Sequence, residues 1–178
     1  MTSVGLYEFA IGIATVVSAA GGFVAAYAAH RSAKSAHEAA ASAAEESRRT
    51  SLRDLSFTAA QVVNECLSIQ SIAGDLTVEY RAAEVFSGSS AHSALQGLIR
   101  ATNQFASKAG EMLDDARKFT SGARSLAEAP REDIDRVAIR MGEHLLGAGL
   151  IRDELVRKLT EMNRLNADER SRRHARGP

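Results

Sequence analysis

Residues 55–83, LSFTAAQVVNECLSIQSIAGDLTVEYRAA, carry the pattern that decides the fold. Apolar or small side chains recur there at alternating spacings of four and three, through Leu55, Ala59, Val62, Cys66, Ile69, Ala73, Leu76, Tyr80 and Ala83. This spacing keeps one face of an α-helix apolar and is typical of helices that pack side by side. The stretch therefore predicts a long helix whose apolar stripe contacts other helices.

Two further stripes of the same kind follow along the chain. The first runs through Leu98, Thr102, Phe105, Ala109, Met112, Ala116 and Phe119. The second runs through Ile134, Ala138, Met141, Leu145, Ala148, Arg152, Leu155, Leu159 and Met162. Its charged member, Arg152, either extends to solvent along its apolar stem or pairs with a buried acceptor that sets the register.

Turn signals separate the three stripes. The polar run at residues 87–90 contains a glycine, Gly122 is suited to capping a helix C-terminus, and Pro130 is suited to opening the next helix. Short connections between helices of similar length make consecutive helices antiparallel. We therefore predict an all-α fold in which residues 51–166 form a coiled-coil-like bundle of three helices in up-down-up order. Its predicted core comprises Leu55, Val62, Cys66, Ile69, Leu76, Leu98, Phe105, Met112, Phe119, Ile134, Met141, Leu145, Leu155, Leu159 and Met162.

Residues 9–29, FAIGIATVVSAAGGFVAAYAA, contain no charged side chain. A helix of 21 residues is about 30 Å long, which matches the hydrocarbon thickness of a bilayer. We predict a transmembrane helix here. Two alternatives remain open: a buried helix of a soluble protein, because Ala and Gly are frequent, and a cleaved signal peptide, although no Lys or Arg precedes the stretch.

The charges beside this stretch predict its orientation. Residues 1–8 hold no Lys or Arg, whereas Arg31, Lys34, Arg48 and Arg49 follow the span. Because positive flanks stay in the cytoplasm, we expect a short extracytoplasmic N-terminus at residues 1–8 and a cytoplasmic C-terminus, in the inner or plasma membrane.

A row of small side chains begins inside the predicted span and continues beyond it. Its members are again spaced by three and four residues; they are Ala19, Gly22, Ala26, Ala29, Ala33, Ala36, Ala40 and Ala43, and we call this row the small-residue seam. Small residues let helix backbones approach closely, so the seam predicts packing against a second copy or another helical membrane protein. The alternative is that it only reflects alanine-rich composition. We expect residues 30–50 to form a helical stalk, with a fourth bundle helix as the alternative.

Twenty-two basic and 22 acidic side chains cancel, which disfavours both a basic nucleic-acid binder and an acidic disordered chain. The last twelve residues, 167–178, are expected to form a basic disordered tail. Within this tail Arg170, Arg172, Arg173 and Arg176 are candidates for contact with anionic lipid. No aromatic residues lie between them, so we expect no specific nucleic-acid binding.

No motif for catalysis, cofactor binding or metal binding is present in the sequence. It lacks a glycine-rich phosphate loop and the HExxH motif, and its one cysteine excludes paired-cysteine zinc sites. Cys66 lies within the first bundle stripe and is expected to be a buried structural thiol rather than a redox sensor. We expect a non-enzymatic protein without cofactor or metal.

These features predict a single-pass, membrane-anchored scaffold or adaptor that self-associates or binds a partner by helix packing. One alternative is a membrane-active effector in which several Ala/Gly-rich spans form a pore. Another is a sensory or signalling input module.

Overall fold

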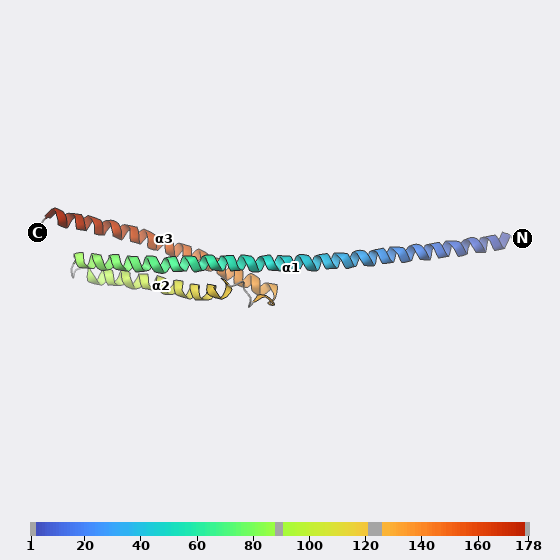
Figure 1. Cartoon of the computed structure of the whole chain (residues 1–178), viewed down its shortest axis with the longest axis horizontal. Helices are drawn as coiled ribbons and strands as arrows, with labels where there is room; N and C mark the ends of the chain where they lie inside the picture. The colour runs from blue at the N-terminus through green and yellow to red at the C-terminus, as the bar shows by residue number, and fades with distance from the viewer. Residues whose placement is uncertain (1–2, 88–90, 121–125, 177–178) are drawn as a thin grey trace. The chain divides into compact units, whose positions relative to one another are not determined.

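The computed structural model contains three long helices (Figure 1). It describes the backbone of residues 3–87, 91–120 and 126–176, and the side chains of 25–87, 91–120 and 126–175. Helix α1 spans Ser3–Ser87, α2 spans His92–Thr120 and α3 spans Arg131–Arg176. No strand occurs in these described ranges, so the predicted all-α fold is confirmed.

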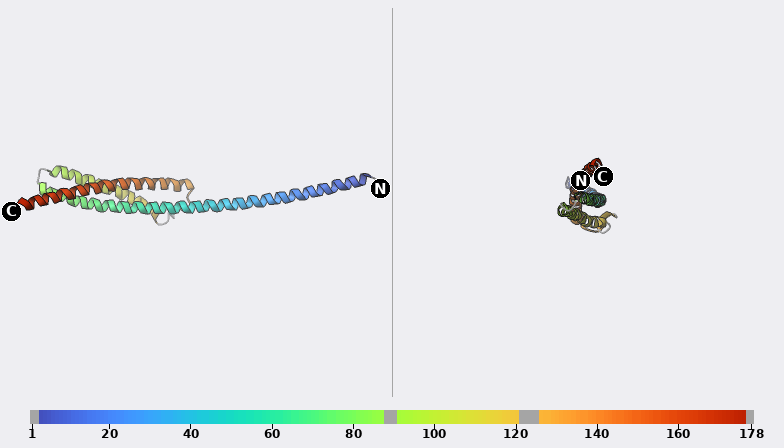
Figure 2. Two further views of the ribbon diagram at one scale, coloured as in Figure 1. Left: turned by 90° about the horizontal axis from the view of Figure 1, so that it is seen from above. Right: turned by 90° about the vertical axis from the view of Figure 1, so that its left-hand side faces the viewer.

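The chain divides into two units, residues 1–48 and residues 49–178. The first unit contains the N-terminal part of α1, and every side chain from residue 25 to residue 46 is exposed. In the second unit, residues 49–87 of α1 pack with α2 and α3, and the views of Figure 2 show these three segments side by side. The prediction of a helical bundle is confirmed.

The helix ends lie close to the turn signals in the sequence. Helix α1 ends at Ser87, where the polar run begins; residues 88–90 and the predicted cap Gly122 lie outside the described residues. Helix α3 begins directly after Pro130, whose carbonyl oxygen accepts hydrogen bonds from the N–H groups of Asp133 (3.1 Å) and Ile134 (3.4 Å). The acidic side chains of Glu132 and Asp133 lie in the first turn, where the helix dipole stabilises negative charge.

The bundle core follows the three stripes. The buried members of the predicted core are Leu55, Val62, Cys66, Ile69, Leu76, Met112, Phe119, Ile134, Met141 and Leu155. The partly buried members that pack against the core are Phe105, Leu145, Leu159 and Met162.

Leu98 does not belong to the core, which corrects the prediction for the start of α2. Its side chain is 39% exposed, whereas Leu95 and Ile99 are both 8% exposed. Adjacent residues of an α-helix point about 100° apart, so the face that buries Ile99 turns Leu98 outward. Leu95, Ile99 and Thr102 keep the spacing of four and three, so Ile99 rather than Leu98 precedes Thr102 on the buried face.

Two predicted segments differ from the structure. The tail expected to be disordered is helical as far as Arg176, because α3 continues without a break; residues 177 and 178 lie outside the described residues. Residues 30–50 belong to the same helix as residues 51–87, so they do not form a separate fourth helix. The SLRD sequence at residues 51–54, which resembles a capping box, lies within this continuous helix.

Among the side chains that the structure describes, no helix is long and apolar enough to cross a membrane. Residues 9–24 of the predicted span precede the first described side chain. The membrane helix therefore stays a prediction from the sequence.

Leu76 tests the bundle core, because its side chain is fully buried. We expect Leu76→Ala to lower the free energy of unfolding by about 2–5 kcal/mol, since it removes buried methyl groups and leaves a cavity. Thermal or urea unfolding followed by circular dichroism measures the change.

Leu67→Ala on the same helix is the matched control, because Leu67 is 44% exposed. It should cost less than about 1 kcal/mol. Equal costs for the two substitutions would contradict the assignment of the buried face.

Candidate functional site

Polar contacts join α1 to α3 in the bundle. Nη1 of Arg152 donates hydrogen bonds to both carboxylate oxygens of Glu65, at 2.7 and 2.8 Å. Two heptads further along both helices, Nδ2 of Asn166 donates to the backbone oxygen of Glu79 at 2.9 Å and to its Oε2 at 2.7 Å. These contacts lie at the same heptad position of each helix.

A third contact continues the series by one more heptad. Nη2 of Arg173 donates to the backbone oxygen of Phe86 at 2.6 Å, and its guanidinium carbon lies 5.1 Å from the centre of the Phe86 ring. All three pairs are separated by 87 residues in the sequence. A constant separation means that α1 and α3 run parallel, as the up-down-up prediction requires.

Asn166 is the most deeply buried polar member of the series, with 2% of its surface exposed. A buried amide is costly unless its protons are bonded, and Glu79 accepts the hydrogen bonds of its nitrogen. A polar residue within a helix-packing interface specifies register because other alignments leave it unpaired. Asn166 is not among the predicted site residues, since it lies four residues beyond Met162, the last member of the predicted stripe.

Arg152 pairs with an acceptor across the interface, which decides between the two alternatives for this residue. It also donates to Oδ1 of Asp153, from Nη2 at 2.9 Å and from Nε at 3.1 Å. The hydrogen bond with Asp153 and the charge of Glu65 both raise the pKa of Arg152 above its ordinary value. The side chain remains 37% exposed, so solvent screens the pair and its main effect is on alignment.

Cys66 lies beside this contact in sequence, and its side chain is fully buried. Burial raises the pKa of the thiol, and the neighbouring charge of Glu65 raises it further. A thiol in this state is a weak nucleophile, because only the thiolate reacts readily. The surroundings of Cys66 favour a structural role.

A second polar cluster joins α2 to α3 around Asp115, whose side chain is 20% exposed. Its Oδ2 lies 3.0 Å from Nε of Arg140 and 3.4 Å from Nε2 of His144, and its Oδ1 lies 3.3 Å from Nζ of Lys118. The guanidinium of Arg140 also lies over the Phe119 ring, 5.9 Å from its centre. The Asp115 carboxylate thus pairs with Lys118 of its own helix and with Arg140 of α3, and His144 of α3 lies beside it.

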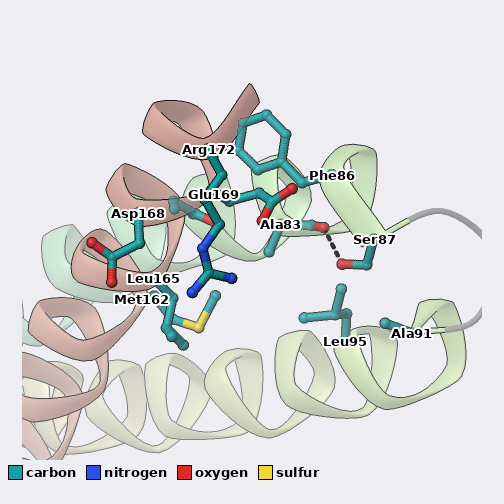
Figure 3. A pocket seen from close by; sticks show the side chains of 11 residues that line it. Ala83, Phe86, Ser87, Ala91, Leu95, Met162, Leu165, Asp168, Glu169 and Arg172 are labelled. Atoms are coloured by element: carbon teal, nitrogen blue, oxygen red, sulfur yellow. Dashed lines mark hydrogen bonds between the residues drawn. The ribbon is translucent and has the colours of Figure 1, made fainter. Parts of the chain in front are cut away.

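A groove lies at the end of the bundle where α1 ends and α2 begins (Figure 3). Its volume is about 540 Å³. Apolar lining comes from all three helices: Ala83 and Phe86 of α1, Leu95 of α2, and Met162 and Leu165 of α3.

Charged groups of α3 border the same groove, namely Asp168, Glu169 and Arg172. The groove can accept an apolar side chain of a partner, with the charged groups at its margin. Figure 3 shows one hydrogen bond among the lining side chains, from the Ser87 hydroxyl to the backbone oxygen of Ala83.

The predicted tail contacts are partly used within the bundle. Nη2 of Arg170 lies 3.7 Å from Oε2 of Glu79, and Arg173 contacts Phe86 as described above. Arg172 borders the groove, and the side chain of Arg176 lies outside the described residues. Arg170 and Arg173 thus contact acceptors on α1, namely the Glu79 carboxylate and the Phe86 backbone oxygen.

The small-residue seam is exposed wherever its side chains are described. These are Ala26, Ala29, Ala33, Ala36, Ala40 and Ala43. The side chains of Ala19 and Gly22 lie outside the described part of the chain.

No group of three or more His, Cys, Asp or Glu side chains within the described residues could hold a metal ion. Comparisons with known protein families, with curated proteins and with solved structures each found no match to this chain. The function of the chain is therefore inferred from its sequence and from the geometry of its helices.

Asn166 provides the test of the α1–α3 contacts. We expect Asn166→Ala to lower the free energy of unfolding by about 1–3 kcal/mol, because both hydrogen bonds of the buried amide to Glu79 are lost, one of them to a carboxylate. Urea unfolding monitored by circular dichroism gives the value. Asn163→Ala, at an exposed position of the same helix, is the control and should be neutral or slightly stabilising. A neutral Asn166→Ala would show that these hydrogen bonds do not hold the register.

Proposed function

We propose that the chain is a single-pass, membrane-anchored helical scaffold or adaptor that self-associates or binds a partner helix, without catalytic activity. The uncharged stretch at residues 9–29 supports the anchor, since its length suits a bilayer. The positive residues that follow it support a cytoplasmic bundle.

The exposure of the small-residue seam carries the proposal. Every described side chain from residue 25 to residue 46 is exposed, although the segment is helical. Most of the stability of a protein helix comes from packing of one face, and an isolated helix is marginal in water. A helix with one row of small side chains offers a face on which another helix can approach closely. We infer that this face is covered by a second helix in the functional protein.

The polar groups of the bundle support a non-catalytic role. Glu65, Arg152, Asp115 and His144 have partners on neighbouring helices, so their hydrogen-bonding capacity is used in holding the bundle together. The groove at the end of the bundle adds an apolar surface for a partner side chain.

Enlarging the seam tests the proposed contact. Ala29→Leu and Ala36→Leu place bulky side chains where two backbones must come close, so we expect each to reduce the assembled fraction several-fold. Crosslinking of the full-length chain in membranes, followed by mass measurement in mild detergent, gives that fraction.

Ala28→Leu and Ala41→Leu are matched controls, because they make the same change at neighbouring exposed positions off the seam. They should assemble like the unmodified chain. If all four variants assemble equally well, the seam reflects composition alone and the proposed function loses its support.

The anchor has a separate test. Reporters that are active in only one compartment, fused to the C-terminus, should show activity on the cytoplasmic side, with the full-length chain in the membrane fraction. Full-length protein in the soluble fraction would refute the anchor. Reporter activity outside the cytoplasm would reverse the orientation.

A further inference from the structure

Helix α3 carries a second row of heptad-spaced residues on its outer side. The row consists of Glu132, Arg136, Ile139, Glu143, Leu146, Leu150, Asp153 and Arg157, again at alternating spacings of four and three, and we call it the outer stripe. All eight side chains are exposed. Its large apolar side chains are highly exposed to solvent: Ile139 is 65% exposed, and Leu146 and Leu150 are each 73% exposed.

The end charges of the outer stripe are complementary when the stripe is read in opposite directions. From the N-terminal end the order is acidic and basic, then the central residues Ile139, Glu143, Leu146 and Leu150, then acidic and basic again. An antiparallel second copy that sets Ile139 against Leu150 brings Glu132 opposite Arg157. The same alignment brings Arg136 opposite Asp153. At each end of the interface, two successive pairs of residues therefore carry opposite charges.

A parallel alignment gives the opposite result. Each charged residue would then face its own equivalent, so Glu132, Arg136, Asp153 and Arg157 would all meet like charges. Like charges across an interface cost free energy and suppress the wrong orientation. Of these two alignments, only the antiparallel one pairs opposite charges.

We propose that the outer stripe of α3 binds the outer stripe of a second copy in antiparallel orientation, with a two-fold axis between residues 144 and 145. Such an interface is isologous, as in most homodimers, because the same surface serves both copies. Ile139 and Leu150 form two apolar layers. At the centre, Leu146 packs against the methylene stem of Glu143 of the other copy while the carboxylate extends to solvent.

The backbone beside the stripe favours close approach. A side chain built at Gly142 or at Gly149 would meet nothing within 4 Å, so space is open next to Leu146 and Leu150.

Charged members of the stripe contact side chains of their own helix. Arg136 lies 3.1 Å from Asp133, and Arg157 lies 2.9 Å from Glu154. Asp153 accepts hydrogen bonds from the partly exposed Arg152 at 2.9 and 3.1 Å. Exposed pairs of this kind contribute little, so they can be exchanged for pairs across the interface.

Cysteine pairing tests both the partner and the orientation. Full-length chains with Ile139→Cys are mixed with full-length chains with Leu150→Cys in mild detergent and oxidised, and each variant is also oxidised alone. The native Cys66 is fully buried and does not interfere. We expect the disulfide between the two different chains to form at least about fivefold more than either self-pair.

This readout reports contacts of α3 only, so association through the small-residue seam does not produce it. Equal self-pairing of each variant would show a parallel contact and overturn the proposal. Absence of pairing, or pairing with a different protein instead, would show that the outer stripe does not bind a second copy.

Charge exchange tests the register. Arg136→Asp and Asp153→Arg should each weaken the pairing about tenfold, because each places like charges together in two layers. The double variant restores opposite charges between copies and should pair within about threefold of the unmodified stripe. Arg81→Asp, an exposed charge reversal on α1, is the control and should leave pairing unchanged. A double variant as weak as the single variants would refute the proposed register.

Discussion

The parallel alignment of α1 with α3 is the constraint on which the rest of the bundle depends. In the observed alignment Asn166 lies against Glu79, and its amide donates two hydrogen bonds there. A slip of one heptad would place Asn166 against Ile72 or Phe86, whose side chains cannot replace the Glu79 carboxylate as acceptor. Because a hydrogen bond to a charged group contributes about 1.5–3 kcal/mol, its loss disfavours both neighbouring registers. Helix α2 packs against both α1 and α3 in the common core. Its Asp115 contacts Arg140 and His144 of α3.

Two helix faces of different character are exposed among the described side chains: the small-residue seam from Ala26 to Ala43 and the outer stripe of α3. The small-residue seam on α1 permits close backbone contact. It suits packing against another helix whose backbone lies close by, as between helices in a membrane. The outer stripe on α3 has large apolar side chains between charges of alternating sign, which suits side-chain packing with fixed orientation. The proposed scaffold role needs surfaces of this kind, whereas the polar groups between the helices contact one another and hold the bundle together.

Local periodicity explains why much of the fold could be predicted. Spacings of three and four identify the inner face of each helix, and turn residues mark the end of α1 and the start of α3. The phase at the start of α2 could not be predicted, since it depends on which neighbours Leu95 and Ile99 meet. The helical tail also escaped prediction, because Arg173 finds its acceptor at Phe86, 87 residues away in the sequence. The outer stripe could not be recognised from the sequence alone, because its exposure depends on which face of α3 packs against α1 and α2.

The native mass of the full-length chain tests the central claim most directly. The protein, extracted in mild detergent over a range of concentrations, is measured by native mass spectrometry. A scaffold that acts through uncovered helix faces predicts masses of two or more 19.0 kDa chains, or of one chain with a bound protein. A single 19.0 kDa species at every concentration, with no bound protein, would contradict the account.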